Sequence, residues 1–404
     1  MKTVPIETPD PKSKQKTNSN YSLYFYTFLT INLIAVIVNS YLPIYFYNVL
    51  NVDRTQLAFA QIISYSALFI KPVISIYFDR NPRLKFPIRL LLVGIGVGIL
   101  LSFIAFILSI PILIIFGIFL GINFAFTSVI DVIIKKVLIK KSDTEKEKNR
   151  NVLYFQAGSL IGAFLPPILS ILLPWSMFFI SSIIIVAPLI IVLAFLGKPE
   201  YAPDKEKLTT DTFKAEFSFK NIALVCIFTF LIYADQLYQY PLEPYLVDFM
   251  GQLLFNIVFM IFLLINTIGI IFAGIISHRW NKKKILVYNT ILTGLLLLLT
   301  PFVPLFIFLF IYAVLMIVGG FIIVNLISLL IDVSKERITI YQTIAVFVVI
   351  AKIVLVPLGT GLSEFLASEW IIFIAGILFL LALIPLYFIQ TSPTQNQNSD
   401  IRQD

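Results

Sequence analysis

The chain has 404 residues, of which 59% are apolar and only 13% charged, and its formal net charge is +8. Soluble globular domains have about 45–50% apolar and about 25% charged residues, so this composition excludes a soluble protein and indicates an integral membrane protein. A single cysteine, Cys226, and a single histidine, His278, exclude an intramolecular disulfide and a zinc cluster. We expect no cofactor and no metal.

Residues 1–20 are polar and lack the apolar core of a signal peptide, so we expect a disordered cytoplasmic tail. Twelve apolar stretches follow, each long enough to cross a hydrocarbon layer of about 30 Å as a helix. They lie near residues 21–49, 55–78, 86–109, 111–138, 151–173, 175–197, 219–248, 252–277, 285–300, 304–332, 338–365 and 369–390. The polar, proline-containing segment 198–218 is the expected cytoplasmic linker between two halves, and residues 391–404 form a second cytoplasmic tail.

Charged landmarks repeat along the chain at almost the same offset. Asp79 and His278 follow the second and eighth stretches and are 199 positions apart. Asp131 and Asp332 lie late in the fourth and tenth stretches and are 201 positions apart. Duplicated membrane halves are the usual architecture of secondary transporters. We therefore predict an all-α membrane protein with twelve transmembrane helices, arranged as two six-helix bundles (21–197 and 219–390) with pseudo-twofold symmetry.

The distribution of positive charge predicts the orientation. All Lys and Arg residues except Arg54, Lys71 and Lys352 lie in the tails or in and beside the loops after even-numbered stretches. By the positive-inside rule both termini are cytoplasmic, and membrane topology rather than nucleic-acid binding explains the net charge. The third, sixth, ninth and twelfth stretches have no ionisable residue in their interiors, so we expect them to face lipid. We expect a monomeric, multi-pass protein of the plasma membrane.

The most polar interior belongs to the seventh stretch. Asp235 lies near its middle, Gln236 follows, and Gln239 lies one turn further on the same face. Lys352 has the matching depth in the eleventh stretch, and because a lone buried charge is strongly disfavoured, we expect Asp235 and Lys352 to pair. Two roles stay open: a permanent salt bridge that orders the bundle, or a carboxylate that exchanges between Lys352, a proton and the substrate.

Other polar residues at depth are candidates for substrate contact or for helix packing. Lys71 can reach the interface, pair with Asp131, or anchor an anionic group. Asn32 and Asn39 offer neutral hydrogen bonds. Glu243, near the outer end of the seventh stretch, is expected to be solvated. Tyrosines of the first and seventh stretches are candidates for stacking on a planar ring, namely Tyr24, Tyr26, Tyr41, Tyr45, Tyr47, Tyr238 and Tyr240.

Two loops carry related charge motifs. The first keeps Asp79, Arg80 and Arg83, with Ser75 and Pro82 in place of glycines, and the second keeps Gly274, Arg279, Lys282 and Lys283. Both resemble the motif Gly-x-x-x-Asp-Arg-x-Gly-Arg-Lys of the major facilitator superfamily, and with the 6+6 stretches the resemblance covers essentially the whole chain. It implies transport of a small solute by alternating access. It also implies a conformational latch formed by Asp79, Arg80, Arg83, Asp131, Arg279 and Asp332.

A narrower resemblance concerns the substrate. Segments 68–72 and 128–132 are similar to the folate-biopterin transporter branch, whose substrates are anionic pterins, and a proton is the candidate coupling ion of such a symporter. The alternatives are an exporter of amphipathic drugs, a sugar symporter and a membrane-embedded lipid-handling enzyme. An enzyme is disfavoured because the sequence has no intramembrane histidine, no clustered aspartate pair and no soluble catalytic domain.

Overall fold

The computed structural model describes residues 19–80, 113–140, 145–196, 218–276, 281–334 and 338–390, and these residues form helices without any β-strand. The first part contains α1 (Ser19–Val36), η2 (Ile37–Tyr41), α2 (Leu42–Ile44), η3 (Tyr45–Val49), α3 (Arg54–Ser66), η4 (Ala67–Phe69), α4 (Ile70–Arg80), α6 (Leu113–Lys140), α7 (Glu145–Leu172) and α8 (Trp175–Leu196). The second contains α10 (Phe219–Ile232), α11 (Gln236–Met250), α12 (Gln252–Ile276), α13 (Lys282–Leu298), η5 (Thr300–Phe302), α14 (Leu305–Ser334), α15 (Ile338–Leu362), α16 (Ser368–Leu381) and α17 (Leu383–Phe388).

Each predicted stretch except the third corresponds to one of these helices or to a run of them. The third stretch, 86–109, lies outside the described residues, as do most of segment 198–218 and the tail 391–404. Within the described part, eight helical stretches are long and apolar enough to cross a membrane. The prediction of a multi-pass, all-α membrane protein is therefore confirmed.

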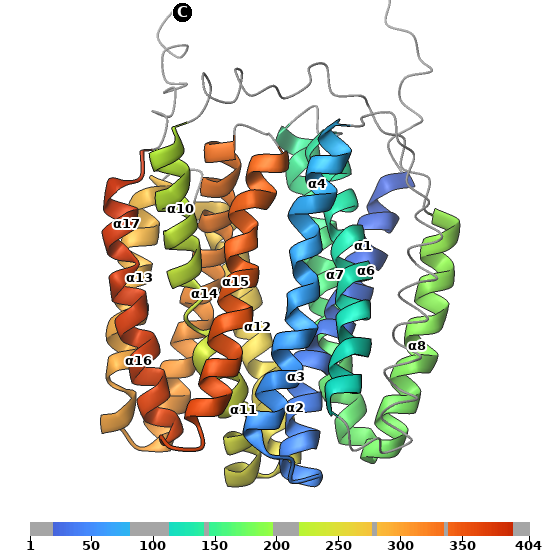
Figure 1. The fold of residues 1–404 in the computed structure, drawn as a ribbon, viewed down its shortest axis with the longest axis vertical. Coiled ribbons are helices and arrows are strands. Elements are labelled where there is room, and N and C mark those ends of the chain that lie inside the picture. Colours follow the sequence, from blue (N-terminus) through green and yellow to red (C-terminus); the bar gives the residue numbers. More distant parts are fainter. Residues whose placement is uncertain are drawn as a thin grey trace, which may run out of the picture.

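The helices run side by side in two groups. Figure 1 shows α1 to α8 on one side and α10 to α17 on the other. The groups touch through α15 against α3 and α4, α12 against α7, and α11 against α2, η2 and η3. Figure 1 places α8 at one edge and α13, α16 and α17 at the opposite edge, where uncharged helices were expected to face lipid. We call the end with the short turns at 50–53, 251 and 363–367 the turn end, and the opposite end the terminal end.

Closest approach between helices occurs at glycines in corresponding helix pairs of the two groups. Gly158 of α7 lies against the carbonyl of Phe25 in α1, and Gly359 of α15 lies against the carbonyl of Leu237 in α11. At both positions a Cβ atom would overlap the carbonyl oxygen. These are the first and fifth predicted stretches in one case and the seventh and eleventh in the other, so corresponding helix pairs make close glycine contacts in both halves, at different depths.

The carbonyl that Gly359 approaches is one that its own helix cannot use. Pro241 has no N–H group, so the carbonyl of Leu237, four residues earlier, lacks its usual helical donor. With no side chain on Gly359, the α15 backbone can cover this carbonyl and shield it from lipid.

A break between α10 and α11 is the main departure from the predicted helices. Residues 233–235 form a turn in which Ala234 N donates to Leu231 O at 3.1 Å and Gln236 N donates to Tyr233 O at 3.1 Å, a tighter i to i+3 pattern. Neither Gly nor Pro occurs in the turn, so no residue in it predicted a break. The break places Asp235 at the start of α11, where its orientation differs from that in a continuous helix.

We expect Gly359→Ala to destabilise the protein, because the new methyl group must push α15 away from Leu237. Overpacking of this kind lowers the free energy of unfolding by about 1–3 kcal/mol. Gly361→Ala is the matched control, since nothing lies within 4 Å of a Cβ at that position. Thermal unfolding of the two purified variants measures the difference, and equal melting temperatures would contradict the packing argument.

Candidate functional site

A cavity of about 290 Å³ lies between the two groups of helices, and we call it the interface cavity. Its wall comes from α1, η2, α3, η4, α4 and α6 on one side and from the 233–235 turn, α14 and α15 on the other. In the predicted order these are the first, second and fourth stretches and the seventh, tenth and eleventh. The first and seventh stretches and the fourth and tenth are corresponding pairs, so helices of both halves enclose the cavity.

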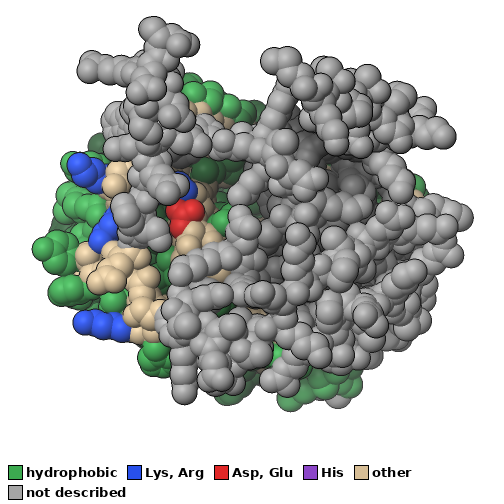
Figure 2. Space-filling model, turned by 90° about the horizontal axis from the view of Figure 1, so that it is seen from above, with side chains coloured by type: hydrophobic (Ala, Val, Ile, Leu, Met, Phe, Trp, Pro, Cys, Tyr) green, Lys and Arg blue, Asp and Glu red, His purple; other side chains and the backbone are tan. Residues whose placement is uncertain are grey.

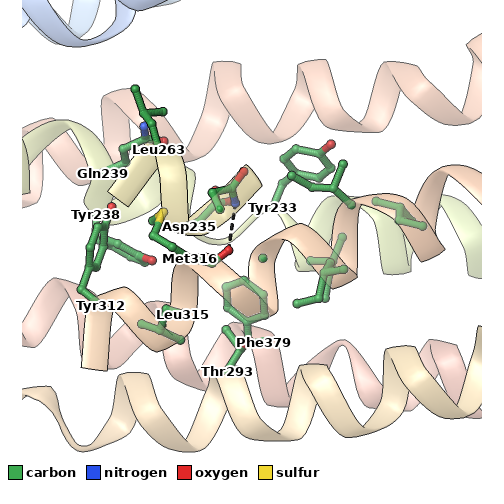
Figure 3. Close-up of a pocket in the computed structure, with 16 residues that line it drawn as sticks. Tyr233, Asp235, Tyr238, Gln239, Leu263, Thr293, Tyr312, Leu315, Met316 and Phe379 are labelled. Atoms are coloured by element: carbon green, nitrogen blue, oxygen red, sulfur yellow. Dashed lines mark hydrogen bonds between the residues drawn. The ribbon is translucent and has the colours of Figure 1, made fainter. Parts of the chain in front are cut away.

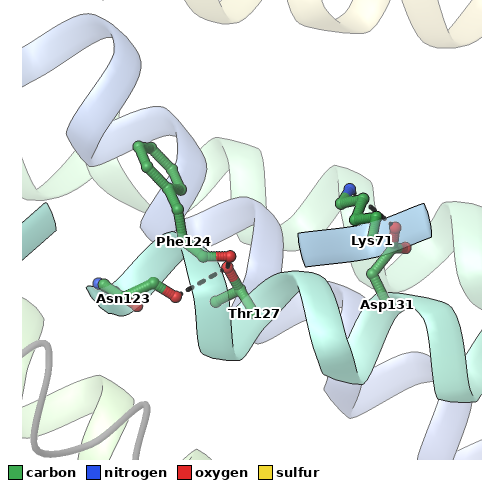
Figure 4. Close-up of polar contacts among 5 residues, drawn as sticks. All are labelled: Lys71, Asn123, Phe124, Thr127 and Asp131. Atoms are coloured by element: carbon green, nitrogen blue, oxygen red, sulfur yellow. Dashed lines mark hydrogen bonds and ion pairs between the residues drawn. The ribbon is translucent and has the colours of Figure 1, made fainter. Parts of the chain in front are cut away.

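Two of the predicted charged residues meet on the amino-terminal wall of the interface cavity. Lys71 Nζ donates to Asp131 Oδ2 at 3.1 Å, and the side chains are 22% and 11% exposed (Figure 4). The nearby Thr127 hydroxyl turns back onto its own helix and donates to the carbonyls of Asn123 and Phe124. Since the ion pair is partly exposed to the cavity, a ligand can reach Lys71 without unfolding the wall.

Lys352 occupies the opposite wall of the interface cavity, on α15. No hydrogen bond or ion pair of its ammonium group occurs among the described residues. Two buried polar atoms of the same lining, Gln342 Nε2 and Ser128 Oγ, also have no hydrogen-bond partner there. With Lys71 and Asp131 compensating each other, Lys352 leaves the cavity with one excess positive charge and unused hydrogen-bonding groups.

Aromatic rings complete the interface cavity, although they differ from the predicted ones. Tyr65 and Phe124 stack at 5.3 Å between ring centroids with an interplanar angle of 22°, and both line the cavity together with Tyr233 and Tyr341. None of the seven tyrosines proposed from the sequence belongs to this lining. Those tyrosines were predicted because they lie in the first and seventh stretches. The rotation of each helix about its axis decides which ring faces the cavity.

A second cavity, of about 270 Å³, lies within the carboxyl-terminal group, and we call it the carboxyl-terminal cavity. Asp235 and Gln239 line it, together with residues of α12, α13, α14 and α16 (Figure 3). Gln236 Nε2 donates to Asp235 Oδ2 at 3.1 Å and to Gln239 Oε1 at 3.3 Å. The polar cluster predicted for the seventh stretch is therefore assembled, but it faces this cavity.

The expected ion pair between Asp235 and Lys352 is not formed. The two charges interact electrostatically, yet no hydrogen bond or ion pair joins these two described residues. The physical reason is the break at residues 233–235, which turns Asp235 toward α12 and α14, while Lys352 faces the interface cavity. Tyr233 lines both cavities and stands between them.

At the turn end, side chains of the two groups hydrogen-bond directly and close this end of the interface. Ser40 donates to Glu243 Oε1 at 3.1 Å, and the hydroxyls of Tyr65 and Tyr240 are 2.8 Å apart. Further pairs across the groups are Tyr41 with Asn256, Asn48 with Asp248, Arg54 with the Ser363 carbonyl, Thr55 with Glu364, and Gln61 with Thr360. Several of the amino-terminal partners lie on the π-helical segments η2 and η3, and such segments are frequent at functional sites.

Glu243 is the site residue that sequence reasoning misplaced. It was expected to be solvated near the outer end of its stretch, but it is only 5% exposed and its Oε2 atom has no hydrogen-bond partner. Burial follows from the packing of α11 against η2 of the other group, a contact that hydropathy does not encode. The one available signal was its position between Pro241 and Pro244.

The remaining predicted residues lie elsewhere. Asn32 Nδ2 donates to Ser159 Oγ at 2.9 Å and joins α1 to α7, whereas Asn39 accepts from the Tyr65 hydroxyl at 3.0 Å and lines the interface cavity. Figure 2 shows basic side chains around an acidic one at the terminal end, where Lys282 Nζ donates to Asp332 Oδ2 at 2.9 Å. The Asp79 and Arg80 side chains, and Arg83, His278 and Arg279 entirely, lie outside the described part.

Comparisons with known proteins agree with this architecture. The family model described as Major Facilitator Superfamily matches residues 4–138 and 225–404. The chain belongs to the Major Facilitator Superfamily. A solved structure of a variant of the nucleoside transporter NupG aligns with 92% of the present chain and with 100% of the NupG chain, at a TM-score of 0.67 and 14% sequence identity. At this identity the match shows a likeness of fold. A search of curated protein sequences gave no match.

Membership of this superfamily makes the chain a multi-pass membrane protein of a transporter family and supports a small-molecule solute as its partner. It also argues against the membrane-embedded enzyme that the sequence left as an alternative. The interface cavity is the candidate solute site of this superfamily member, since helices of both halves enclose it.

We expect Tyr65→Phe to loosen the turn end, because it removes the hydroxyl that contacts Asn39 and Tyr240 while its ring can still stack on Phe124. Each lost hydrogen bond is worth about 0.5–1.5 kcal/mol, so the open population should rise by about 2- to 10-fold. The measurement is labelling of Ser128→Cys in a Cys226→Ser background by an impermeant thiol reagent added from the turn end.

Tyr245→Phe is the control for this substitution, since the Tyr245 hydroxyl contacts Glu369 within its own group of helices. Its labelling rate should equal that of the unmodified background. A Tyr65→Phe protein that labels no faster than the control would show that these bonds do not hold the turn end closed.

Proposed function

We propose that the chain is a secondary transporter of the plasma membrane that moves a small anionic solute with a planar, pterin-like ring through the interface cavity by alternating access. The proposed architecture has twelve transmembrane helices in two six-helix bundles, 21–197 and 219–390, with both termini cytoplasmic. Three features support the pseudo-twofold relation: the repeated landmarks, the glycine contacts in corresponding helix pairs, and the reciprocal contacts of α15 with α3 and α4 and of α12 with α7.

The observation that carries the anionic substrate is the charge of the interface cavity. Lys71 is paired with Asp131, and Lys352 has no ion-pair partner among the described residues. Since an isolated cation in a membrane interior is costly, a site with one excess positive charge favours an anion that compensates it. The unpaired Gln342 Nε2 and Ser128 Oγ atoms add hydrogen-bonding groups, and the rings of Tyr65 and Phe124 suit a planar solute.

Closure at the turn end supports one state of the proposed cycle. With the termini cytoplasmic, the cross-group contacts at the turn end close the cavity to the outside, which supports an inward-facing state. The ion pair of Lys282 with Asp332 supports a latch role for the second motif copy. By the family resemblance, Asp79, Arg80, Arg83 and Arg279 would contribute to the same latch together with Asp131.

We expect Lys352→Gln to weaken binding of a planar aromatic anion by tenfold or more, because a hydrogen bond to a charged group contributes about 1.5–3 kcal/mol. Benzenesulfonate and pterins are suitable probes, and isothermal titration calorimetry on the purified protein measures the affinity. Lys283→Gln is the control, since Lys283 binds the Tyr387 and Ile389 carbonyls outside the cavity. Unchanged affinity in Lys352→Gln would favour an exporter of amphipathic solutes instead.

We propose further that a proton accompanies a second negative charge on the solute. A dianion needs Lys71 as well as Lys352, and separating Lys71 from Asp131, its ion-pair partner at 3.1 Å, costs free energy in a low-dielectric wall. Protonation of Asp131 removes this cost. A lower pH favours the protonated carboxyl, so it favours binding of the dianion.

The expected result is that benzenedisulfonate binds more tightly as the pH falls from about 8 to about 5, a range that covers a carboxyl group displaced by its surroundings. Benzenesulfonate, which needs Lys352 alone, should lack the part of this response that Asp131 supplies, since both probes keep their charge. Asp131→Asn should reduce the pH response of disulfonate binding to that of benzenesulfonate binding. A disulfonate affinity without pH dependence in the unmodified protein would refute this proton-linked step.

A further inference from the structure

The carboxyl-terminal cavity has the chemistry of a ligand site that transport through the interface cavity does not use. It is enclosed by the turn between α10 and α11 and by α12, α13, α14 and α16, all within one group of helices. Its volume of about 270 Å³ nearly equals that of the interface cavity. A bare alkali ion would leave most of this space empty.

One uncompensated acid dominates the electrostatics of this cavity. Asp235 Oδ1 is buried and has no hydrogen-bond partner, while Oδ2 accepts from Gln236. No Lys or Arg belongs to the lining, and Lys352 acts on Asp235 only from a distance beyond an ion pair. The hydroxyl of the buried Thr293, in the same lining, also lacks a partner. A positively charged ligand with an N–H or alkyl surface would compensate the carboxylate.

Aromatic and aliphatic side chains form most of the remaining wall. Figure 3 shows Tyr238 beside Tyr312 at one end and Phe379 next to Thr293. The Tyr312 ring is held by Phe262, with ring centroids 4.9 Å apart, and by Phe308 at 5.7 Å. Rings next to a carboxylate bind alkylammonium ions through cation–π attraction. An alkali ion would use only the oxygen atoms of the lining, whereas the side chains of Leu263, Leu315 and Met316 offer an apolar surface that suits the alkyl groups of an ammonium ion.

We propose that the carboxyl-terminal cavity binds a small organic ammonium ion, with Asp235 as its counter-ion and the rings of Tyr238, Tyr312 and Phe379 around its alkyl groups. The site is separate from the interface cavity, with Tyr233 in the wall that both share.

Occupancy of this site acts on the interface cavity through charge. Asp235 partly offsets the field of Lys352, and an ammonium ion at Asp235 removes that offset. An anion at Lys352 then binds more tightly, and by reciprocity the anion strengthens ammonium binding. This coupling rests on the proposed function, whereas the ammonium site itself does not.

The experiment titrates purified full-length protein in nanodiscs with tetramethylammonium and butylammonium chloride at constant ionic strength, with sodium chloride as the reference. Saturable binding by calorimetry and a rise in Tm are expected for an ammonium ion and absent for sodium. Asp235→Asn should abolish the saturable response, whereas Asp248→Asn should retain it. Sodium giving the same saturable response, or Asp235→Asn retaining ammonium binding, would overturn the proposal.

A second pair of variants tests the aromatic wall and serves if Asp235→Asn fails to fold. Phe379→Leu should weaken ammonium binding by about 5-fold or more, since it removes one cation–π partner. Phe373→Leu, on the same helix α16, is the matched control because Phe373 packs on Trp370 and does not line the cavity. Equal affinities of the two variants would contradict the assigned pose.

Lys352→Gln separates this inference from the proposed function. If both hold, Lys352→Gln loses anion binding and keeps ammonium binding, and in the unmodified protein a saturating ammonium ion tightens benzenesulfonate binding by about 5-fold or more. If ammonium ions bind but the anion affinity is the same with and without Lys352, the anion site is refuted and the ammonium site stands. If anion binding depends on Lys352 but ammonium ions neither bind nor change the anion affinity, the ammonium site is refuted and the anion site stands.

Discussion

The hydrocarbon interior of a membrane offers no water to solvate an ion, so each charge at depth must be paired within the protein or face a polar cavity. The arrangement of this chain follows from the different ways in which its few buried charges meet that constraint. Lys71 and Asp131 meet it by pairing at 3.1 Å. Lys352 and Asp235 meet it by facing separate cavities, and their mutual attraction acts across the wall between them.

Backbone groups obey the same constraint and explain where the helices touch most closely. The carbonyl of Leu237 loses its helical donor to Pro241 and is covered by Gly359. At the turn of residues 233–235 the amides of Ala234 and Gln236 stay bonded through the tighter i to i+3 pattern, so a break at depth leaves few polar groups exposed. The irregular backbone thus occurs where it borders cavities, and it is this turn that sets the direction of Asp235.

Hydropathy and charge spacing predicted much of this fold because the bilayer imposes them on any spanning chain. Eleven of the twelve stretches coincide with described helices, and the depth of Asp235, Lys352, Lys71 and Asp131 followed from their positions along those stretches. The direction in which each side chain points could not be predicted from hydropathy and charge spacing. The rotation of a helix about its axis depends on contacts far away in sequence, such as that of Ser40 with Glu243, which buries an acid expected in solvent. The break that separates Asp235 from Lys352 contains neither Gly nor Pro, so no local residue predicted it.

The separation of Asp235 and Lys352 has a consequence for binding. A buried ion pair in direct contact is held strongly, and removing one partner from such a pair costs about 3–5 kcal/mol. A ligand that had to take Lys352 from a contacting carboxylate would lose that amount from its affinity. Because the two charges only interact through the wall at Tyr233, each remains open to a ligand of opposite sign while still stabilising the other when both sites are empty. For the two proposed sites, weakly coupled charges favour ligand exchange at both cavities, which a tight salt bridge at the same depth would oppose.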